Sequence, residues 1–235
     1  MGTGPDFARF DRRRYPTVSA REGYHAWAPT YEKTVEDVMD LALLERIGSV
    51  EWDAVARAAD LGCGSGRTAG WLRSRGDFPV DGVDVTPAML ELARARGIHD
   101  RLVEGDVRDS GLPGAAYDLV VCVLVDEHLP ELARLYAEGR RLLGHGGSFV
   151  VVGIHPYFVM SVGMPTHFDL PGAGPLAIET FVHLPSEHVA AATGAGFTLR
   201  ELHEALVDDE FVRRKPGWQP YRDWPFSSAW VWALP

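Results

Sequence analysis

Cysteine is scarce in this chain, and it has neither long apolar runs nor an excess of basic residues. Only two of its 235 residues are cysteines, Cys63 and Cys122, and they lie far apart without the spacing of metal ligands. This pattern excludes a disulfide framework and indicates a reducing compartment. The first residues lack the apolar segment of a signal peptide, and no run is long enough to span a membrane. We expect a cytoplasmic protein that does not enter a membrane.

Acidic residues outnumber basic ones, with 33 Asp and Glu against 23 Lys and Arg, which gives a formal net charge of -10. This balance argues against a nucleic-acid backbone or an anionic membrane as the main partner. The length suits one α/β domain with its own core and is short for two. The sequence contains no signal for the oligomeric state.

The middle of the chain alternates short apolar runs with helical patterns, which indicates a parallel sheet covered by helices. Helices are expected at 67–76, 86–97, 129–143 and 186–196, and strands at 55–60, 78–84, 101–107, 117–125, 148–153, 197–207 and 227–234. The predicted fold class is α/β: a Rossmann-like, doubly wound, seven-stranded sheet, mostly parallel, with an antiparallel last strand and a helical N-terminal cap.

We expect a single domain with four parts. Residues 1–53 have the apolar spacing of amphipathic helices and form the cap. Residues 54–153 form the core, and 154–185 form an irregular, aromatic-rich lid or acceptor loop. Residues 186–235 supply a helix and the last two strands.

A glycine-rich turn lies in AADLGCGSGRTAGWL, residues 58–72, between a strand and a helix. One part of it, Gly64 to Ala69, matches the dinucleotide fingerprint G-x-G-x-x-A. Another part places Asp60 two residues before three alternating glycines. A carboxylate at Asp60 would face a pyrophosphate unfavourably, so the turn favours a cationic ligand without phosphate.

Three acids follow successive strands. Asp60, Asp84 and Asp106 stand at or just beyond the ends of parallel strands, so they are expected to meet in one crevice at the carboxyl edge of the sheet. Asp84 follows Gly66 by 18 residues and is placed to accept hydrogen bonds from two ribose hydroxyls. A nicotinamide cofactor would use such an acid too, so Asp84 does not separate the two cofactors.

Four motifs occur in a consistent order: DLGCGSG at 60–66, VDGVDVTPAML at 80–90, EGDVRDSGLPGAAYDLVV at 104–121 and RLLGHGGSFVVVG at 141–153. Together they resemble the class I S-adenosylmethionine-dependent methyltransferases, in particular the type 11 or UbiE-like small-molecule group. The resemblance implies S-adenosyl-L-methionine as cofactor and S-adenosyl-L-homocysteine as product.

The resemblance also implies roles for individual residues. Asp106 would accept from the adenine amine while the Val107 amide donates to the ring. Asp60 would lie near the methionine ammonium, through backbone or water, and Arg67 near the methionine carboxylate. The cofactor-binding residues expected on this basis are Tyr24, Tyr31, Asp60, Gly62, Cys63, Gly64, Arg67, Asp84, Val85, Met89, Asp106, Val107 and Val123.

Catalytic candidates come from the segments after the fourth and fifth strands. His155 follows the fifth strand directly and is the first choice as general base or acceptor-orienting residue. Glu127 and His128, after the fourth strand, are the alternatives. Four further residues, His167, Asp169, His183 and His188, have ligand chemistry but irregular spacing, so no metal site is expected.

These features predict methyl transfer to a hydroxyl or amine, or to a carbon, of a small, apolar or aromatic metabolite. Two alternatives stay open at this stage. One is a protein that binds S-adenosylmethionine without methyl transfer, as a sensor, scaffold or cyclase. The other is an NAD(P)-dependent oxidoreductase.

Overall fold

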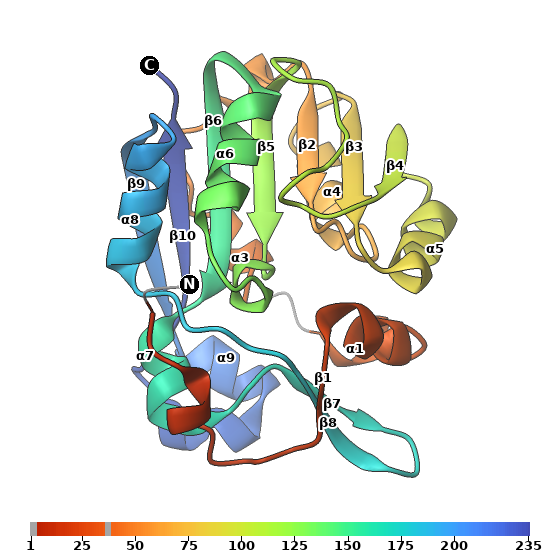
Figure 1. Cartoon of the computed structure of the whole chain (residues 1–235), viewed down its shortest axis with the longest axis vertical. Helices are drawn as coiled ribbons and strands as arrows, with labels where there is room; N and C mark the ends of the chain where they lie inside the picture. Colours follow the sequence, from red (N-terminus) through yellow and green to blue (C-terminus); the bar gives the residue numbers. More distant parts are fainter. Residues whose placement is uncertain (1–3, 36–38) are drawn as a thin grey trace.

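A seven-stranded sheet with helices on both faces forms the centre of the computed structural model, which describes residues 4–35 and 39–235 (Figure 1). From edge to edge the strand order is β4-β3-β2-β5-β6-β10-β9. The strands are β2 (Ala58–Leu61), β3 (Val80–Asp84), β4 (Arg101–Glu104), β5 (Tyr117–Val123), β6 (Leu143–Ile154), β9 (Thr198–Leu206) and β10 (Pro225–Ala233). β10 runs antiparallel to β6 and β9, whereas the pairs from β4 to β6 are parallel. The predicted sheet with its antiparallel last strand is confirmed.

Helices cover both faces because the central strands are apolar on both sides. In β5, Val120 and Cys122 belong to the core shared with α6 and α8, whereas Leu119 and Val121 belong to the core shared with α3 and α4. The longer helices are α1 (Ala20–Trp27), α4 (Arg67–Arg73), α5 (Pro87–Arg96), α6 (Ala133–Leu142), α8 (Pro185–Gly194) and α9 (Asp209–Arg214). The short ones are α2 (Tyr31–Thr34), α3 (Leu41–Leu44) and α7 (Pro156–Phe158).

A second, small sheet lies beyond the carboxyl ends of the parallel strands, next to α1 (Figure 1). Its order is β1-β8-β7, with β1 (Thr17–Val18), β7 (His167–Leu170) and β8 (Gly174–Ile178). β1 pairs in parallel with β8, so the N-terminal cap is joined to the segment expected to be an irregular lid. That segment is therefore more ordered than its sequence predicted. Within the two described ranges, no helix has both the length and the apolar composition to cross a bilayer.

Candidate functional site

A cavity of about 270 Å³ lies at the carboxyl ends of β2, β3 and β5, with α1 along one wall. The residues expected to bind the cofactor all line it, with the single exception of Asp60. Open parallel sheets place their ligand sites at this edge because the loops leaving the strands converge there. The structure therefore brings together side chains from the cap and from four segments of the core.

The glycine-rich turn after β2 has a backbone that only glycine adopts easily. Gly62, Gly64 and Gly66 have φ values of +76°, +52° and +85°, in the left-handed region. A Cβ on Gly62 would lie closer than 3.0 Å to a methyl group of Val125. The turn thus brings backbone, without side chains, to the wall of the cavity, as a closely bound ligand requires.

Asp84, the last residue of β3, holds this turn in place. Its Oδ2 accepts the N–H of Gly64 at 2.9 Å, and its Oδ1 accepts the N–H of Thr86 at 2.8 Å. The carboxyl group is nearly buried, and burial raises its pKa although both N–H groups lower it. A carboxylate oxygen can accept more than one hydrogen bond, and Asp84 lines the cavity, so it can also accept from the expected ribose hydroxyls.

Asp60 does not line the cavity. It lies inside β2 rather than beyond its end, and its carboxylate is buried beneath the turn, where Oδ2 is 4.0 Å from Nε2 of the buried His99. Burial raises the pKa of Asp60. A direct contact of its side chain with the ligand is therefore not part of this site.

Arg67 lines the cavity but is already paired. Its Nη1 and Nη2 donate to Oδ2 and Oδ1 of Asp40, at 3.0 and 3.1 Å. Tyr31 is adjacent, and burial raises its pKa to about 12 against the opposing effect of Arg67. A methionine carboxylate at this position would share the guanidinium with Asp40.

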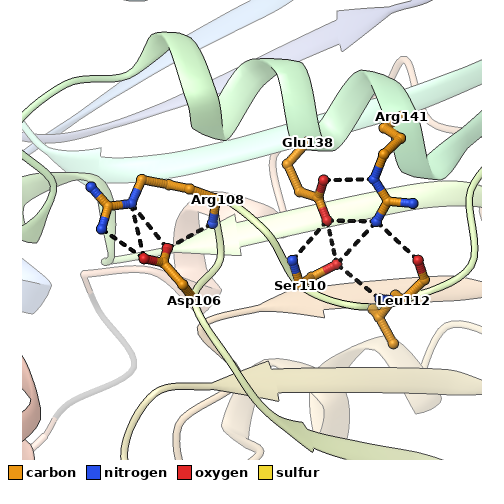
Figure 2. A network of polar contacts seen from close by, with 6 residues as sticks. All are labelled: Asp106, Arg108, Ser110, Leu112, Glu138 and Arg141. Carbon is orange, nitrogen blue, oxygen red and sulfur yellow. Dashed lines mark hydrogen bonds and ion pairs between the residues drawn. The ribbon is translucent and has the colours of Figure 1, made fainter.

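Asp106 is held by Arg108 in the segment that follows β4 (Figure 2). Nε and Nη2 of Arg108 donate to the carboxylate, with the shortest contact at 2.6 Å, and the Arg108 amide donates at 2.8 Å. The Arg108 hydrogen bond lowers the pKa of Asp106. Asp106 is thus an ionised acceptor on the cavity wall, beside Val107, at the position expected for the adenine amine.

A second polar cluster, Ser110–Glu138–Arg141, anchors the far end of the same segment to α6 (Figure 2). Glu138 accepts the amide and hydroxyl of Ser110 and two N–H groups of Arg141. Burial alone would raise the pKa of Glu138, but the hydrogen bonds from Arg141 and Ser110 outweigh it and lower the pKa.

We expect Glu138→Ala to lower the free energy of unfolding by about 2 kcal/mol, because the buried Ser110 amide loses its acceptor. The pKa of Glu138 is lowered by folding, so its contribution is present above the ordinary carboxyl pKa and disappears as the pH falls through the folded value. Urea unfolding of the parent and of Glu138→Ala, at pH 7 and in acid, measures the difference in the free energy of unfolding. Glu91→Ala, at an exposed position on α5, is the control. Equal stability of Glu138→Ala and the parent at pH 7 would contradict the assigned role.

A second cavity, of about 460 Å³, shares Tyr24, Tyr31 and Leu124 with the first. The cap, the lid segment and the C-terminal segment each contribute aromatic side chains to its walls: Trp27, Phe158, Phe168, Trp218 and Phe226. Trp27 and Phe168 stack at 5.1 Å with an interplanar angle of 6°. The two cavities therefore meet at α1 and at the end of β5.

Two of the three catalytic candidates lie at this junction. Glu127 lines the second cavity and His128 lines the first. Burial and the charge of Asp126 raise the pKa of Glu127 well above its ordinary value, whereas burial lowers the pKa of His128. Burial thus favours the neutral form of both side chains.

The third candidate, His155, lines neither cavity. Its Nε2 lies 3.0 Å from Oε1 of Glu204 on β9, and its Nδ1 accepts the amide of Tyr157 at the start of α7. His155 is thus a helix cap at the end of β6. Because its ring contacts Glu204 on β9 and lines neither cavity, we do not propose His155 as the general base.

The sequence did not reveal the buried polar contacts of Asp126, the residue before Glu127. Asp126 is buried, and its Oδ2 lies 3.4 Å from Nε2 of His188. Nδ1 of His188 lies 2.9 Å from the Tyr136 hydroxyl. A Cβ on Gly153, inside β6, would collide with the Asp126 carboxylate. A glycine within a buried strand often marks such a close approach and was the available signal.

The residues with metal-ligand chemistry are dispersed. His167 and Asp169 line the second cavity, whereas His183 and His188 are buried and do not line it. Nε2 of His183 lies 2.8 Å from the carbonyl of Leu129. In the described part of the chain, no three His, Cys, Asp or Glu side chains are grouped to hold a metal ion.

Comparisons with known proteins agree with this geometry. The model of the methyltransferase-domain family matches residues 59–151. The ubiquinone biosynthesis O-methyltransferase of Marinobacter nauticus is 30% identical over 75% of this chain and 78% of its own length. An uncharacterized methyltransferase of Emericella nidulans is 24% identical over 90% of this chain and 89% of its own length.

Among solved structures, the complex of DhpI with SAH superposes with a TM-score of 0.64 at 19% identity, over 90% of this chain and 94% of that one. This likeness shows the shared fold. The family match and the relatives decide between the two interpretations of the glycine-rich turn, against the nicotinamide cofactor. The chain belongs to the class I S-adenosylmethionine-dependent methyltransferases.

Proposed function

We propose that the protein transfers the methyl group of S-adenosylmethionine to a hydroxyl or amine of a small, largely apolar or aromatic molecule. The observation that carries this proposal is the junction of the two cavities at Tyr24, Tyr31 and Leu124. One cavity contains the cofactor motifs and the other is lined by aromatic rings. A methyl donor and an acceptor placed in them would meet at that junction.

The residues on the first cavity fit the cofactor. Asp84 would accept from the ribose, the Asp106–Val107 segment would hold the adenine, and the glycine-rich turn with Arg67 would hold the methionine part. The bound cofactor supplies an activated methyl group, so the protein has to orient the acceptor, exclude water and remove a proton. Aromatic rings of the cap near the sulfonium would favour its positive charge.

The second cavity combines aromatic rings with polar side chains, among them Thr30, Asp169 and Lys215. Two of its polar side chains, Glu127 and Thr166, each have a buried oxygen for which the described residues supply no hydrogen-bond partner. A buried polar atom without a partner is costly, so a polar group of an acceptor that contacts either oxygen would be favoured. The relative from Marinobacter nauticus, named as an O-methyltransferase, supports an oxygen acceptor.

The test is methyl transfer from S-adenosylmethionine with a ¹³C-labelled methyl group to a panel of phenols, alcohols and amines, read by mass spectrometry. We expect acceptor-dependent labelled product together with S-adenosylhomocysteine. Tight binding of S-adenosylhomocysteine with no labelled product from any panel member would instead favour a protein that binds the cofactor without methyl transfer.

A further inference from the structure

Tyr24 and His128 are in contact at the junction of the two cavities. The Tyr24 hydroxyl, on α1, lies 3.1 Å from Nε2 of His128, in the turn after β5. Tyr24 lines both cavities, whereas His128 lines only the first. A pair that joins the cap to the core at this point stands where an acceptor would meet the cofactor.

The partners of the His128 ring determine its protonation. Nδ1 lies 2.8 Å from the carbonyl oxygen of Glu179, just after β8. A carbonyl oxygen only accepts hydrogen bonds, so Nδ1 carries the proton and Nε2 keeps its lone pair. The Tyr24 hydroxyl therefore donates to Nε2, and its own oxygen is left with lone pairs for another donor.

The groups around the pair keep both rings neutral at rest. Burial lowers the pKa of His128, and burial raises the pKa of Tyr24, with Tyr31 and the nearby carboxyl groups adding to the effect. Glu127 places Oε1 3.9 Å from Nε2 of His128, and the charge of Asp126 favours a proton on the ring. Of the groups from α1, β8 and the turn itself, Asp126 is thus the ionised group that supports an imidazolium.

We propose that Tyr24 and His128 form a proton relay that activates a hydroxyl acceptor, preferably a phenol, for methyl transfer. The acceptor O–H gives its proton to the Tyr24 oxygen while the Tyr24 proton passes to Nε2 of His128. Tyr24 ends neutral, and His128 becomes an imidazolium still bonded to the Glu179 carbonyl. The acceptor oxygen would keep the electron pair that forms its bond to the methyl carbon, and the electron pair of the broken S–CH3 bond would stay on the sulfur of S-adenosylhomocysteine. The imidazolium then returns its proton to water through the same hydroxyl.

The proposal rests on methyl transfer as the proposed function and narrows its acceptor. A cationic amine has no free lone pair and would have to lose a proton before it could accept a methyl group. A phenol enters neutral, fits the aromatic walls and has a proton acidic enough for a histidine base to remove.

The first test needs no acceptor. In protein labelled with ¹⁵N-histidine, we expect His128 to show the Nδ1–H tautomer at pH 7 and a titration midpoint below the ordinary histidine pKa. His128→Gln identifies the signal, and Tyr24→Phe is expected to shift the Nε2 resonance because it loses a hydrogen bond. An Nε2–H tautomer, or an imidazolium at pH 7, would overturn the relay.

The second test uses the phenols of the acceptor panel. Tyr24→Phe and His128→Gln are each expected to lower kcat by about 100-fold or more, with the Kd for S-adenosylhomocysteine within about five-fold. The double variant should lose no more than either single one, because the residues act as a unit. The acid limb of kcat/KM should disappear in His128→Gln.

Tyr157→Phe, at an exposed tyrosine that lines neither cavity, is the matched control and should keep the parental kcat. Additive losses, or full turnover of phenols by Tyr24→Phe, would overturn the relay. A parent that methylates amines and leaves phenols unchanged would also overturn it, while methyl transfer as the proposed function would stand.

Discussion

Asp84→Ala is expected to weaken the binding of S-adenosylhomocysteine by roughly 100-fold, about 3 kcal/mol. The carboxylate is the acceptor assigned to the ribose hydroxyls, and hydrogen bonds to a charged group contribute about 1.5–3 kcal/mol each. The same carboxylate accepts the amides of Gly64 and Thr86, so its removal also loosens the glycine-rich turn. Calorimetric titration of the parent and the variant measures the difference.

Asp118→Ala is the matched control. Asp118 also accepts two backbone amides, those of Ala56 and Arg57, but lies outside both cavities. Asp118→Ala should lower the free energy of unfolding and leave the affinity for S-adenosylhomocysteine unchanged. Asp84→Asn keeps the size of the side chain without its charge and is expected to bind with intermediate affinity. An Asp84→Ala variant that binds within three-fold of the parent would refute the ribose assignment.

Gly62→Ala is expected to lower the free energy of unfolding by about 3 kcal/mol. The left-handed φ of +76° costs an alanine about 1–2 kcal/mol, and the collision of its Cβ with Val125 adds overpacking of about 1–3 kcal/mol. Because the turn lines the cofactor cavity, the affinity for S-adenosylhomocysteine should fall as well. Urea unfolding gives the stability and calorimetry the affinity.

Two further comparisons separate the backbone cost from the cost of the collision with Val125. Gly97 has a φ of +69° at the end of α5, but a Cβ there would meet no atom within 4 Å, so Gly97→Ala should show the backbone cost alone. In a Val125→Ala background the collision is absent, and Gly62→Ala should cost about as much as Gly97→Ala. A Gly62→Ala variant as stable as Gly97→Ala in the parent background would show that the turn adjusts freely.

The sheet could be predicted from the sequence because its strands are buried on both faces. Runs such as 117–125 leave little choice of element, and Thr86, Pro87 and Gly97 mark the ends of α5. The position of the cofactor cavity could be predicted as well, because the strand order brings the carboxyl ends of the parallel strands together. The small sheet could not be predicted, because a two-residue strand such as β1 exists only through its pairing with β8.

Side-chain direction was the harder problem. His155 and His128 both follow a strand, but one ring turns toward Glu204 on β9 and the other faces the cavity. Asp60 lies within β2, so its side chain points to one face of the sheet instead of leaving the strand end. The aromatic cavity combines three distant segments, and a single sequence contains no record of which side chains meet.

The central claim is that the cofactor occupies the first cavity with its sulfur at the junction with the second. A crystal structure with S-adenosylhomocysteine tests it most directly. The account predicts ribose hydroxyls on Asp84, adenine beside Asp106 and Val107, and the sulfur facing Tyr24. A ligand bound elsewhere, or with its sulfur turned away from the aromatic cavity, would contradict the account.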